Sequence, residues 1–173
     1  MNTVFIVGFM GAGKSTIGKK IATKMGYSYT DLDSTIAGIE QKSITQIITE
    51  KGEPYFRKIE ADTLRQIPLS RQIIATGGGT ACFFDSMNWM KAMGIVVYIE
   101  LDEGVLLNRI QSTNLNTRPL IRGMNMDELK NFIHSKLQER TPYYASAHLI
   151  YSPLTEHLDT LIAKINAWEF KNI

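Results

Sequence analysis

The chain has 173 residues, a formal net charge of +2 and 44% hydrophobic residues, which suits one globular domain over residues 1–173. Scattered basic residues argue against a nucleic-acid partner, and no apolar run approaches the roughly 20 residues that span a membrane. A single cysteine, Cys82, excludes an internal disulfide and is expected to be a small buried apolar residue. Since the N-terminus also lacks a signal sequence, we expect a cytoplasmic protein.

Short apolar segments alternate with helical patterns along the chain. This alternation predicts an α/β fold with a parallel sheet covered by helices on both faces. Ligands bind such sheets beyond the carboxyl ends of the strands. Ser43–Gln46 and Asn125–Glu128 read as capping boxes at helix starts. The expected strands are 3–7, 27–30, 72–76, 95–101 and 148–151, and the expected helices are 14–25, 43–65, 85–93, 103–113, 126–145 and 154–170.

The first expected strand leads directly into GFMGAGKST, residues 8–16, which matches the P-loop pattern G-x-x-x-x-G-K-[ST]. In such a loop, backbone N–H groups and the positive end of the following helix attract phosphate oxygens. Lys14 would reach the β- and γ-phosphates, and the Ser15 hydroxyl would hold Mg²⁺. The alternative is an ordinary glycine-rich turn. The segment predicts binding of a nucleoside triphosphate.

Two aspartates, Asp31 and Asp33, follow the second expected strand. If the strand geometry continues, residues two apart point the same way, so both carboxylates enter the site. One acid can hold Mg²⁺ through water, and the other can orient the hydroxyl that is phosphorylated and accept its proton. The alternative is that Asp33 only caps the next helix.

Two further motifs suit a small anionic acceptor. Arg57 and Glu60 are three residues apart on a helix, so an ion pair can fix the guanidinium, which grips a carboxylate in bidentate fashion. Gly77–Gly79 ends the third strand, and we expect a ligand to approach its backbone closely. The alternatives are a surface ion pair without function and a bare tight turn.

Residues 111–125 are polar, contain a proline and a glycine, and separate two expected helices, as is typical of an active-site lid. A disordered surface insertion is the alternative. Arg118 on this segment would stabilise the transferring phosphoryl group, and Arg109 would flank the nucleotide. Arg140 lies near the C-terminal end of a long expected helix, and the alternative is that it is there only because the helix dipole favours a positive charge at that end. Asp102, after the fourth strand, is better placed to cap a helix than to act in catalysis.

Together these segments resemble the shikimate kinase family, a branch of the nucleoside-monophosphate-kinase-like P-loop fold. The resemblance implies a three-layer α/β/α fold, a five-stranded parallel sheet, a mobile lid and usually a monomer. It implies transfer of a phosphoryl group from ATP to the 3-hydroxyl of shikimate. It is carried by residues 8–16, Tyr29–Asp33, Phe56–Glu60, Thr76–Gly79, Arg118–Ile121, and Arg140 with Tyr143 and Tyr144.

The resemblance also implies roles for single residues. Asp33 is the base that holds the reacting hydroxyl, and Lys14 and Arg118 neutralise the phosphoryl group in transit. Ser15 binds Mg²⁺, with Asp31 helping through water. The acceptor-binding helical region covers about residues 33–62 and the lid about residues 111–125. ATP is held by Gly11, Ala12, Gly13, Lys14, Ser15, Thr16, Arg109 and Arg118, and shikimate by Asp33, Arg57, Gly78, Gly79 and Arg140.

Two other functions share the loop. A P-loop kinase of the gluconate type would keep the loop and the lid but phosphorylate another small acid. A non-catalytic nucleotide-binding scaffold would keep the loop, but it would not need Lys14, Asp33 and Arg118 together. A GTPase switch is excluded because the sequence contains no guanine-reading Asn-Lys-x-Asp segment.

Overall fold

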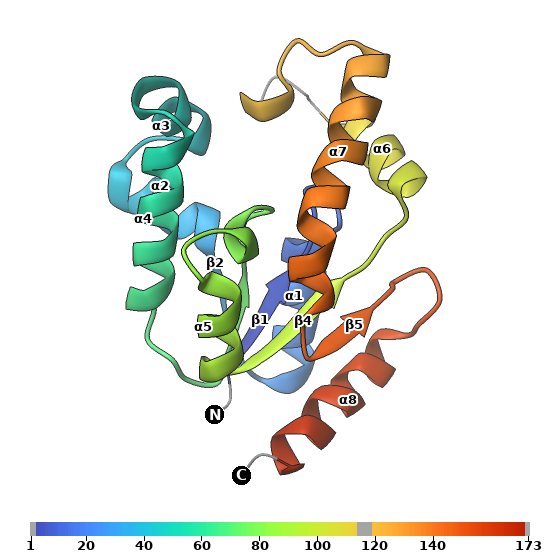
Figure 1. Ribbon diagram of the computed structural model, residues 1–173. Coiled ribbons are helices and arrows are strands. Elements are labelled where there is room, and N and C mark those ends of the chain that lie inside the picture. Colours follow the sequence, from blue (N-terminus) through green and yellow to red (C-terminus); the bar gives the residue numbers. More distant parts are fainter. Residues whose placement is uncertain (1–2, 114–118, 172–173) are drawn as a thin grey trace.

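The computed structural model describes residues 3–113 and 119–171, and its centre is a sheet of five parallel strands (Figure 1). The strand order is β2-β3-β1-β4-β5, with Val4 of β1 opposite Ile73 of β3 and Ile95 of β4. The predicted five-stranded parallel sheet is therefore confirmed. The strands are β1 (Thr3–Val7), β2 (Ser28–Asp31), β3 (Gln72–Ala75), β4 (Ile95–Ile99) and β5 (Leu149–Tyr151).

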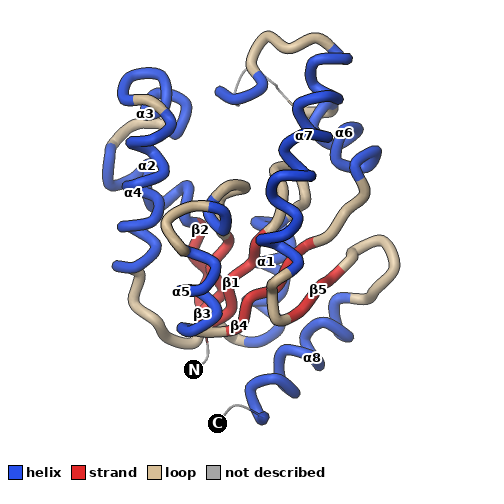
Figure 2. The backbone as a smooth tube through the Cα atoms, in the orientation of Figure 1, coloured by secondary structure: helices blue, strands red, loops and turns tan. Residues whose placement is uncertain are grey.

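Helices cover both faces of the sheet and form a three-layer structure (Figures 1 and 2). Helices α1 (Lys14–Met25) and α8 (Leu158–Lys171) lie on one face, and α5 (Ser86–Met93) and α7 (Met126–Ala145) lie on the other. Helices α2, α3 and α4 gather beside β2, and α6 lies beside α7. Their bounds are α2 (Leu32–Glu40), α3 (Ile44–Lys51), α4 (Glu53–Gln66) and α6 (Glu103–Gln111), with short 3-10 turns η1 (Thr80–Cys82) and η3 (Pro119–Ile121).

The central strands form the middle of the core. All five residues of β1 and of β4 are buried, because helices cover the sheet on both sides. Phe5 of β1 packs edge-on against Trp89 of α5. The carboxyl ends of the strands carry the loops that matter for function, and this firmly packed sheet fixes where those loops begin.

The region after β2 differs from the prediction. The expected helix over residues 43–65 is two helices, because Gly52 has φ 85° and ψ 162°, which no helix accommodates. The chain also turns into α2 directly after Asp31, whose carboxylate accepts a hydrogen bond from the Ser34 N–H at 3.1 Å. Asp31 therefore caps this helix, and the alternative that Asp33 is the cap is wrong.

Other local predictions have mixed outcomes. Both capping boxes, at Ser43 and Asn125, are confirmed. Asp102 occupies the N-cap position of α6, but its side chain makes no capping hydrogen bond. Cys82 is only partly buried, and this burial raises the pKa of its thiol to about 11. Within residues 3–113 and 119–171, no helix is both long and apolar enough to cross a membrane.

Candidate functional site

A cavity of about 720 Å³ opens at the carboxyl ends of the strands, between the group α2–α4 and the pair α6 and α7. It is lined by the loop after β1, the start of α2, the glycines after β3, and parts of α3, α4, α6 and α7. Ala12 is buried behind the loop and does not line it, and Arg118 lies outside the described residues. The other predicted residues all line it: Gly11, Gly13, Lys14, Ser15, Thr16, Asp31, Asp33, Arg57, Gly78, Gly79, Arg109 and Arg140.

The loop between β1 and α1 is built to receive phosphate. Gly11 and Gly13 have φ of 79° and 94°, a region that favours glycine, and Gly13 is the N-cap of α1. The Lys14 ammonium group donates to the Gly8 and Phe9 carbonyls at 2.8 and 3.0 Å. Arg109 reaches the loop from α6 and donates to the Ala12 carbonyl at 3.3 Å. The positive end of α1, a lysine and an arginine thus meet at one end of the cavity.

Asp31 lies beside the loop, at the end of β2. Its Oδ2 atom accepts hydrogen bonds from Ser15 Oγ at 2.7 Å and from the Tyr29 hydroxyl at 3.2 Å. Burial opposes its ionisation, but the hydrogen bonds from Ser15, Ser34 and Tyr29 outweigh it and hold the pKa of Asp31 below its usual value. Asp31 is therefore a carboxylate that touches the predicted metal-binding hydroxyl.

Asp33 lies in the first turn of α2, so strand alternation is not what brings it to the cavity. Its Oδ1 atom is buried and makes no hydrogen bond within the described part of the chain. Burial, and next the negative charge of Glu60, raise the pKa of Asp33 to about 6, against the opposing charge of Lys14. A carboxyl group with such a pKa can act as a base near neutral pH.

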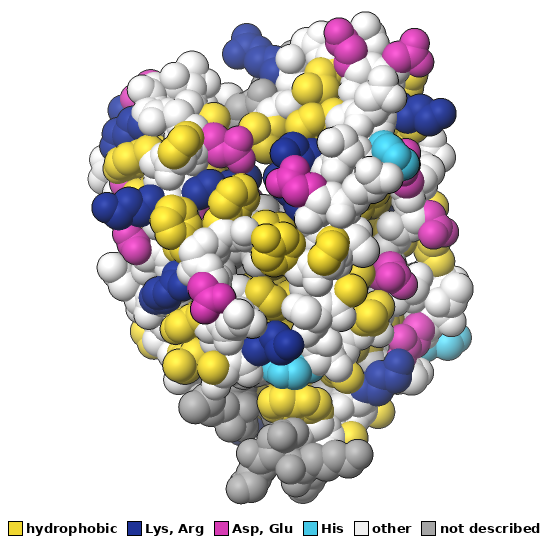
Figure 3. All heavy atoms as spheres, viewed as in Figure 1, with side chains coloured by type: hydrophobic (Ala, Val, Ile, Leu, Met, Phe, Trp, Pro, Cys, Tyr) yellow, Lys and Arg dark blue, Asp and Glu magenta, His cyan; other side chains and the backbone are white. Residues whose placement is uncertain are grey.

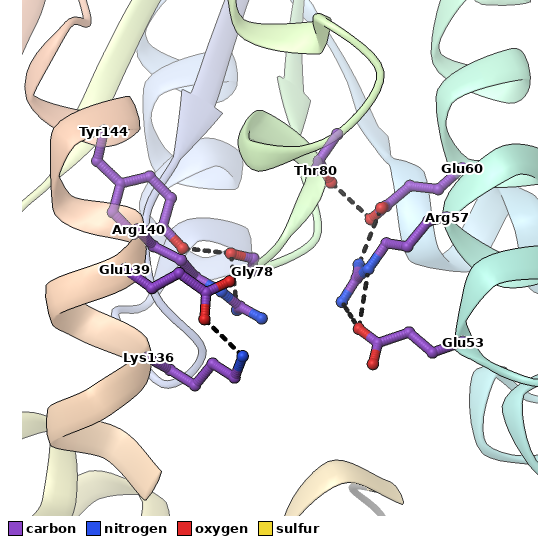
Figure 4. Close-up of polar contacts among 9 residues, drawn as sticks. All are labelled: Glu53, Arg57, Glu60, Gly78, Thr80, Lys136, Glu139, Arg140 and Tyr144. Atoms are coloured by element: carbon purple, nitrogen blue, oxygen red, sulfur yellow. Dashed lines mark hydrogen bonds and ion pairs between the residues drawn. The ribbon is translucent and has the colours of Figure 1, made fainter.

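Arg57 forms one wall of the cavity and is held by two carboxylates (Figure 4). Its Nη1 atom donates to Glu60 Oε2 at 2.9 Å, and its Nε and Nη2 atoms donate to Glu53 Oε1 at 3.1 and 2.9 Å. The predicted ion pair with Glu60 is confirmed, and it is buried, so the alternative of a surface pair is wrong. Glu53 was not predicted as a partner of Arg57, although its opposite charge four residues before Arg57 is a helix-pairing signal.

Arg140 forms the opposite wall, on α7 (Figure 4). Only 2% of its surface is exposed, its Nη1 atom donates to the Gly78 carbonyl at 3.3 Å, and its guanidinium lies over the Phe9 ring. The Tyr144 hydroxyl, which the sequence analysis did not single out for a role, donates to the same carbonyl. The Arg140 Nε atom is buried without a hydrogen bond among the described residues, so this donor is unpaired inside the protein.

Two of the three glycines after β3, Gly77 and Gly79, make room for the wall that Arg57 forms. A Cβ on Gly77 would lie 2.4 Å from Glu60 Oε1, and a Cβ on Gly79 would lie 2.6 Å from Arg57 Cζ. None of the three has a positive φ, so their conformational freedom is not the reason for them. The expected ligand approach is thus an incomplete explanation, because the protein's own side chains already need this space.

The segment expected to be a lid is described only in part. Of its described residues, Leu120 lines the cavity, Ile121 is fully buried, and η3 packs near α3. This segment therefore reaches across from α6 toward the acceptor-side helices. Movement of the lid stays a prediction.

On the surface shown in Figure 3, unlike in the cavity, basic side chains of the described residues do not gather at one place. Lys and Arg side chains on this face are scattered among acidic and hydrophobic ones and form no stripe. Among the described residues, no group of three or more His, Cys, Asp or Glu side chains is arranged to hold a metal ion. Any metal in the cavity would need oxygen atoms from a ligand as well.

Comparison with known proteins gives concordant results. A family model described as shikimate kinase matches residues 10–167. A shikimate kinase of Parabacteroides distasonis is 41% identical over 152 residues, which is 87% of each chain. The crystal structure of a shikimate kinase from Bacteroides thetaiotaomicron superposes with a TM-score of 0.85 at 32% identity, covering 99% of this chain and 98% of that one. A shikimate kinase from Acinetobacter baumannii, solved in complex with shikimate, gives 0.84 at 28% identity, covering 99% and 94%.

Proposed function

The chain belongs to the shikimate kinase family, and on that premise we propose that its cavity transfers the γ-phosphoryl group of ATP to the 3-hydroxyl of shikimate. The observation that carries this proposal is the composition of one cavity: a phosphate loop, the partly buried carboxyl group of Asp33 and two buried arginines. The products are shikimate 3-phosphate and ADP. The proposal treats residues 1–173 as one cytoplasmic kinase domain that acts as a monomer.

The phosphate loop binds the donor in this proposal. Backbone N–H groups of residues 11–16 and the positive end of α1 hold the phosphates of ATP. Lys14 leaves the Gly8 and Phe9 carbonyls and contacts the β- and γ-phosphates. Arg109 lies close enough to the loop to flank the nucleotide. Arg118, on the predicted lid, would add positive charge at the transferring group when the lid closes.

A magnesium ion fits the oxygen atoms beside the loop. Mg²⁺ usually takes one or two carboxylates and completes its shell with phosphates and water. Ser15 Oγ and Asp31 Oδ2, which lie 2.7 Å apart, are such oxygen atoms, and Asp31 stays ionised because its pKa is lowered. When bound there with ATP, the ion would neutralise negative charge on the phosphates.

Asp33 acts on the acceptor. It accepts the proton of the 3-hydroxyl as that oxygen bonds to the γ-phosphorus and the bond to the β,γ-bridging oxygen breaks. Its unpaired Oδ1 atom and its pKa of about 6 suit this role, since most of the carboxyl groups are ionised at pH 7. Arg57, Arg140 and the backbone of Gly78 and Gly79 hold the ring and the carboxylate of shikimate.

The two alternatives differ from this proposal in ways that can be measured. A kinase of the gluconate type would use the same donor site with another acid, and a scaffold would bind ATP without turnover. We therefore propose an assay of ADP release with shikimate, quinate, gluconate and nucleoside monophosphates, each with and without Mg²⁺. We expect turnover on the order of 1–100 s⁻¹ with shikimate and Mg²⁺. Tight ATP binding without turnover of any acceptor would favour the scaffold.

A further inference from the structure

The hydrogen bonds behind Arg57 extend beyond its two carboxylates to Thr80 (Figure 4). Thr80 begins η1, directly after the three glycines, and is 1% exposed. Its hydroxyl donates to Glu60 Oε1 at 2.6 Å, while Glu60 Oε2 accepts from Arg57 Nη1 at 2.9 Å. Each oxygen of Glu60 therefore has its own donor, and the bond from Thr80 fixes the orientation in which Glu60 meets Arg57.

Asp33 lies against the same group of oxygen atoms. A Cβ on Gly77 would be 2.4 Å from Glu60 Oε1, 3.0 Å from Asp33 Oδ1 and 3.1 Å from Thr80 Oγ1, so the three oxygens surround one point. When both acids are ionised, the Thr80 hydroxyl is the member of this trio that carries a hydrogen. The charged groups that act on Asp33 are Glu60, Lys14, Asp31 and Arg57.

On the basis of the proposed function, we propose that Thr80 is a positioning residue for shikimate phosphorylation. It fixes Glu60, and through Glu60 it sets the orientation of the Arg57 guanidinium and the negative charge beside Asp33. Thr80 does not line the cavity, so its effect passes through Glu60 and not through contact with a substrate. A buried carboxylate that loses a donor is free to rotate, and rotation of Glu60 disturbs both of its neighbours.

The test compares Thr80→Val, which replaces the hydroxyl with a methyl group, with Thr80→Ser, which keeps the hydroxyl. Thr3→Val is the matched control, because Thr3 is 1% exposed and its hydroxyl donates to the Ser70 carbonyl at 2.8 Å, at the other end of the strands. We expect Thr80→Val to raise the KM for shikimate about tenfold and the KM for ATP less than about twofold. Thr80→Ser should stay within about threefold of the wild type, and Thr3→Val should change neither constant.

The split between kinetic constants separates positioning from a purely structural role. Loss of the hydroxyl frees Glu60 and Arg57 on one wall of the cavity and leaves the phosphate loop intact. The KM for shikimate should therefore rise in Thr80→Val while kcat and the KM for ATP stay close to the wild type, and Thr80→Ser should restore the KM. A Thr80→Val enzyme with a lower melting temperature but an unchanged KM for shikimate would overturn the proposal.

Further variants keep the proposal testable if Thr80→Val does not fold. In that case, Thr80→Ala and Glu60→Gln are measured singly and together. An effect of Thr80→Ala that largely disappears in the Glu60→Gln background supports action through Glu60, and additive effects contradict it. If the wild type does not phosphorylate shikimate, the proposed function fails instead. The Thr80 proposal is then decided by the NMR signals of the Arg57 guanidinium N–H groups, and signals that are the same in the wild type and in the folded variant overturn it.

Discussion

Two buried arginines face one cavity, and the protein holds them in opposite ways (Figure 4). Arg57 contacts two carboxylates, which neutralise its charge before any ligand arrives. Arg140 forms no ion pair within residues 3–113 and 119–171; the adjacent Glu139, whose pKa is lowered by Lys136 and also by Arg140, pairs with Lys136 at 2.6 Å. The Arg140 guanidinium contacts a main-chain carbonyl and an aromatic ring.

This difference assigns different work to the two side chains. A buried charge that is already paired mainly shapes its surroundings, whereas a buried charge without a counter-ion attracts one. In the proposed function, Arg57 and its two carboxylates form a fixed wall beside Asp33, and Arg140 supplies the charge for the carboxylate of the acceptor.

The largest effect should be on stability. Arg57→Met leaves Glu60, which is 1% exposed, without its cation, and should lower the free energy of unfolding by about 3–5 kcal/mol. Arg140→Met removes a charge that has no counter-ion among the described residues, and should change the free energy by less than about 1 kcal/mol. Urea unfolding of both variants at pH 8 without ligands measures the difference. An equal loss of unfolding free energy in the two variants would contradict the distinction between Arg57 and Arg140.

The next largest effect is on turnover, when Asp33 is replaced. Asp33→Asn should lower kcat by about 100-fold or more and leave ATP affinity unchanged, because the base is lost and the phosphate loop is intact. In the wild type, kcat/KM for shikimate should fall as the pH drops below about 6, where Asp33 takes up a proton. Asp62→Asn, an exposed position on α4, is the control. Loss of ATP affinity in Asp33→Asn would place this residue in the donor site.

The same substitution should stabilise the fold. The pKa of Asp33 is raised from 3.8 to about 6, so the native state binds more protons than the unfolded state within that range. Stability from this group therefore falls as the pH rises through that range, and Asn does not have this cost. At pH 8 we expect Asp33→Asn to be more stable than the wild type by about 1–2 kcal/mol in urea unfolding. A variant less stable than the wild type at pH 8 would contradict the raised pKa.

Replacing Arg57 or Arg140 with lysine should raise the KM for shikimate by different amounts. Arg57→Lys should raise the KM for shikimate about tenfold and affect ATP much less, because the bidentate geometry is lost while the charge is kept. Arg140→Lys should raise the KM for shikimate at least about threefold more than Arg57→Lys does, because no carboxylate of the described residues helps to hold the Arg140 side chain in place. Arg65→Lys, on α4 but outside the cavity, is the control. Equal effects on shikimate and ATP would move the residue out of the acceptor site.

The smallest effect concerns the second carboxylate of the Arg57 wall. The Glu53 side chain is 38% exposed, so Glu53→Gln should cost less than about 1 kcal/mol of stability. It also removes a negative charge near the acceptor carboxylate, so the KM for shikimate should fall about two- to threefold. Steady-state kinetics at low and high salt measure this change, which should shrink at high salt. A rise in KM would mean that Glu53 positions Arg57 as strongly as Glu60 does.

The local signals in the sequence were reliable where a few adjacent residues decide the outcome. The bounds of β1 and α1 were predicted to the residue, and both capping boxes form, because each depends on contacts within four residues. Helix 43–65 was predicted as one piece because its apolar spacing continues through Gly52. Helix α2 was missed because strand geometry was extended through Asp33, whereas the Asp31 side chain starts a helix there.

The sequence alone determined the phosphate loop, the parallel α/β fold and the pair of Arg57 with Glu60, since motif spacing and periodicity encode each of them locally. Only the tertiary structure decided how the two arginines differ. That difference depends on residues far apart in the chain: Thr80 against Glu60, and Gly78 against Arg140 and Tyr144. Burial and the placement of counter-charges are properties of the packed protein. No spacing in the sequence could reveal that Arg57 contacts two carboxylates whereas Arg140 contacts a main-chain carbonyl and an aromatic ring.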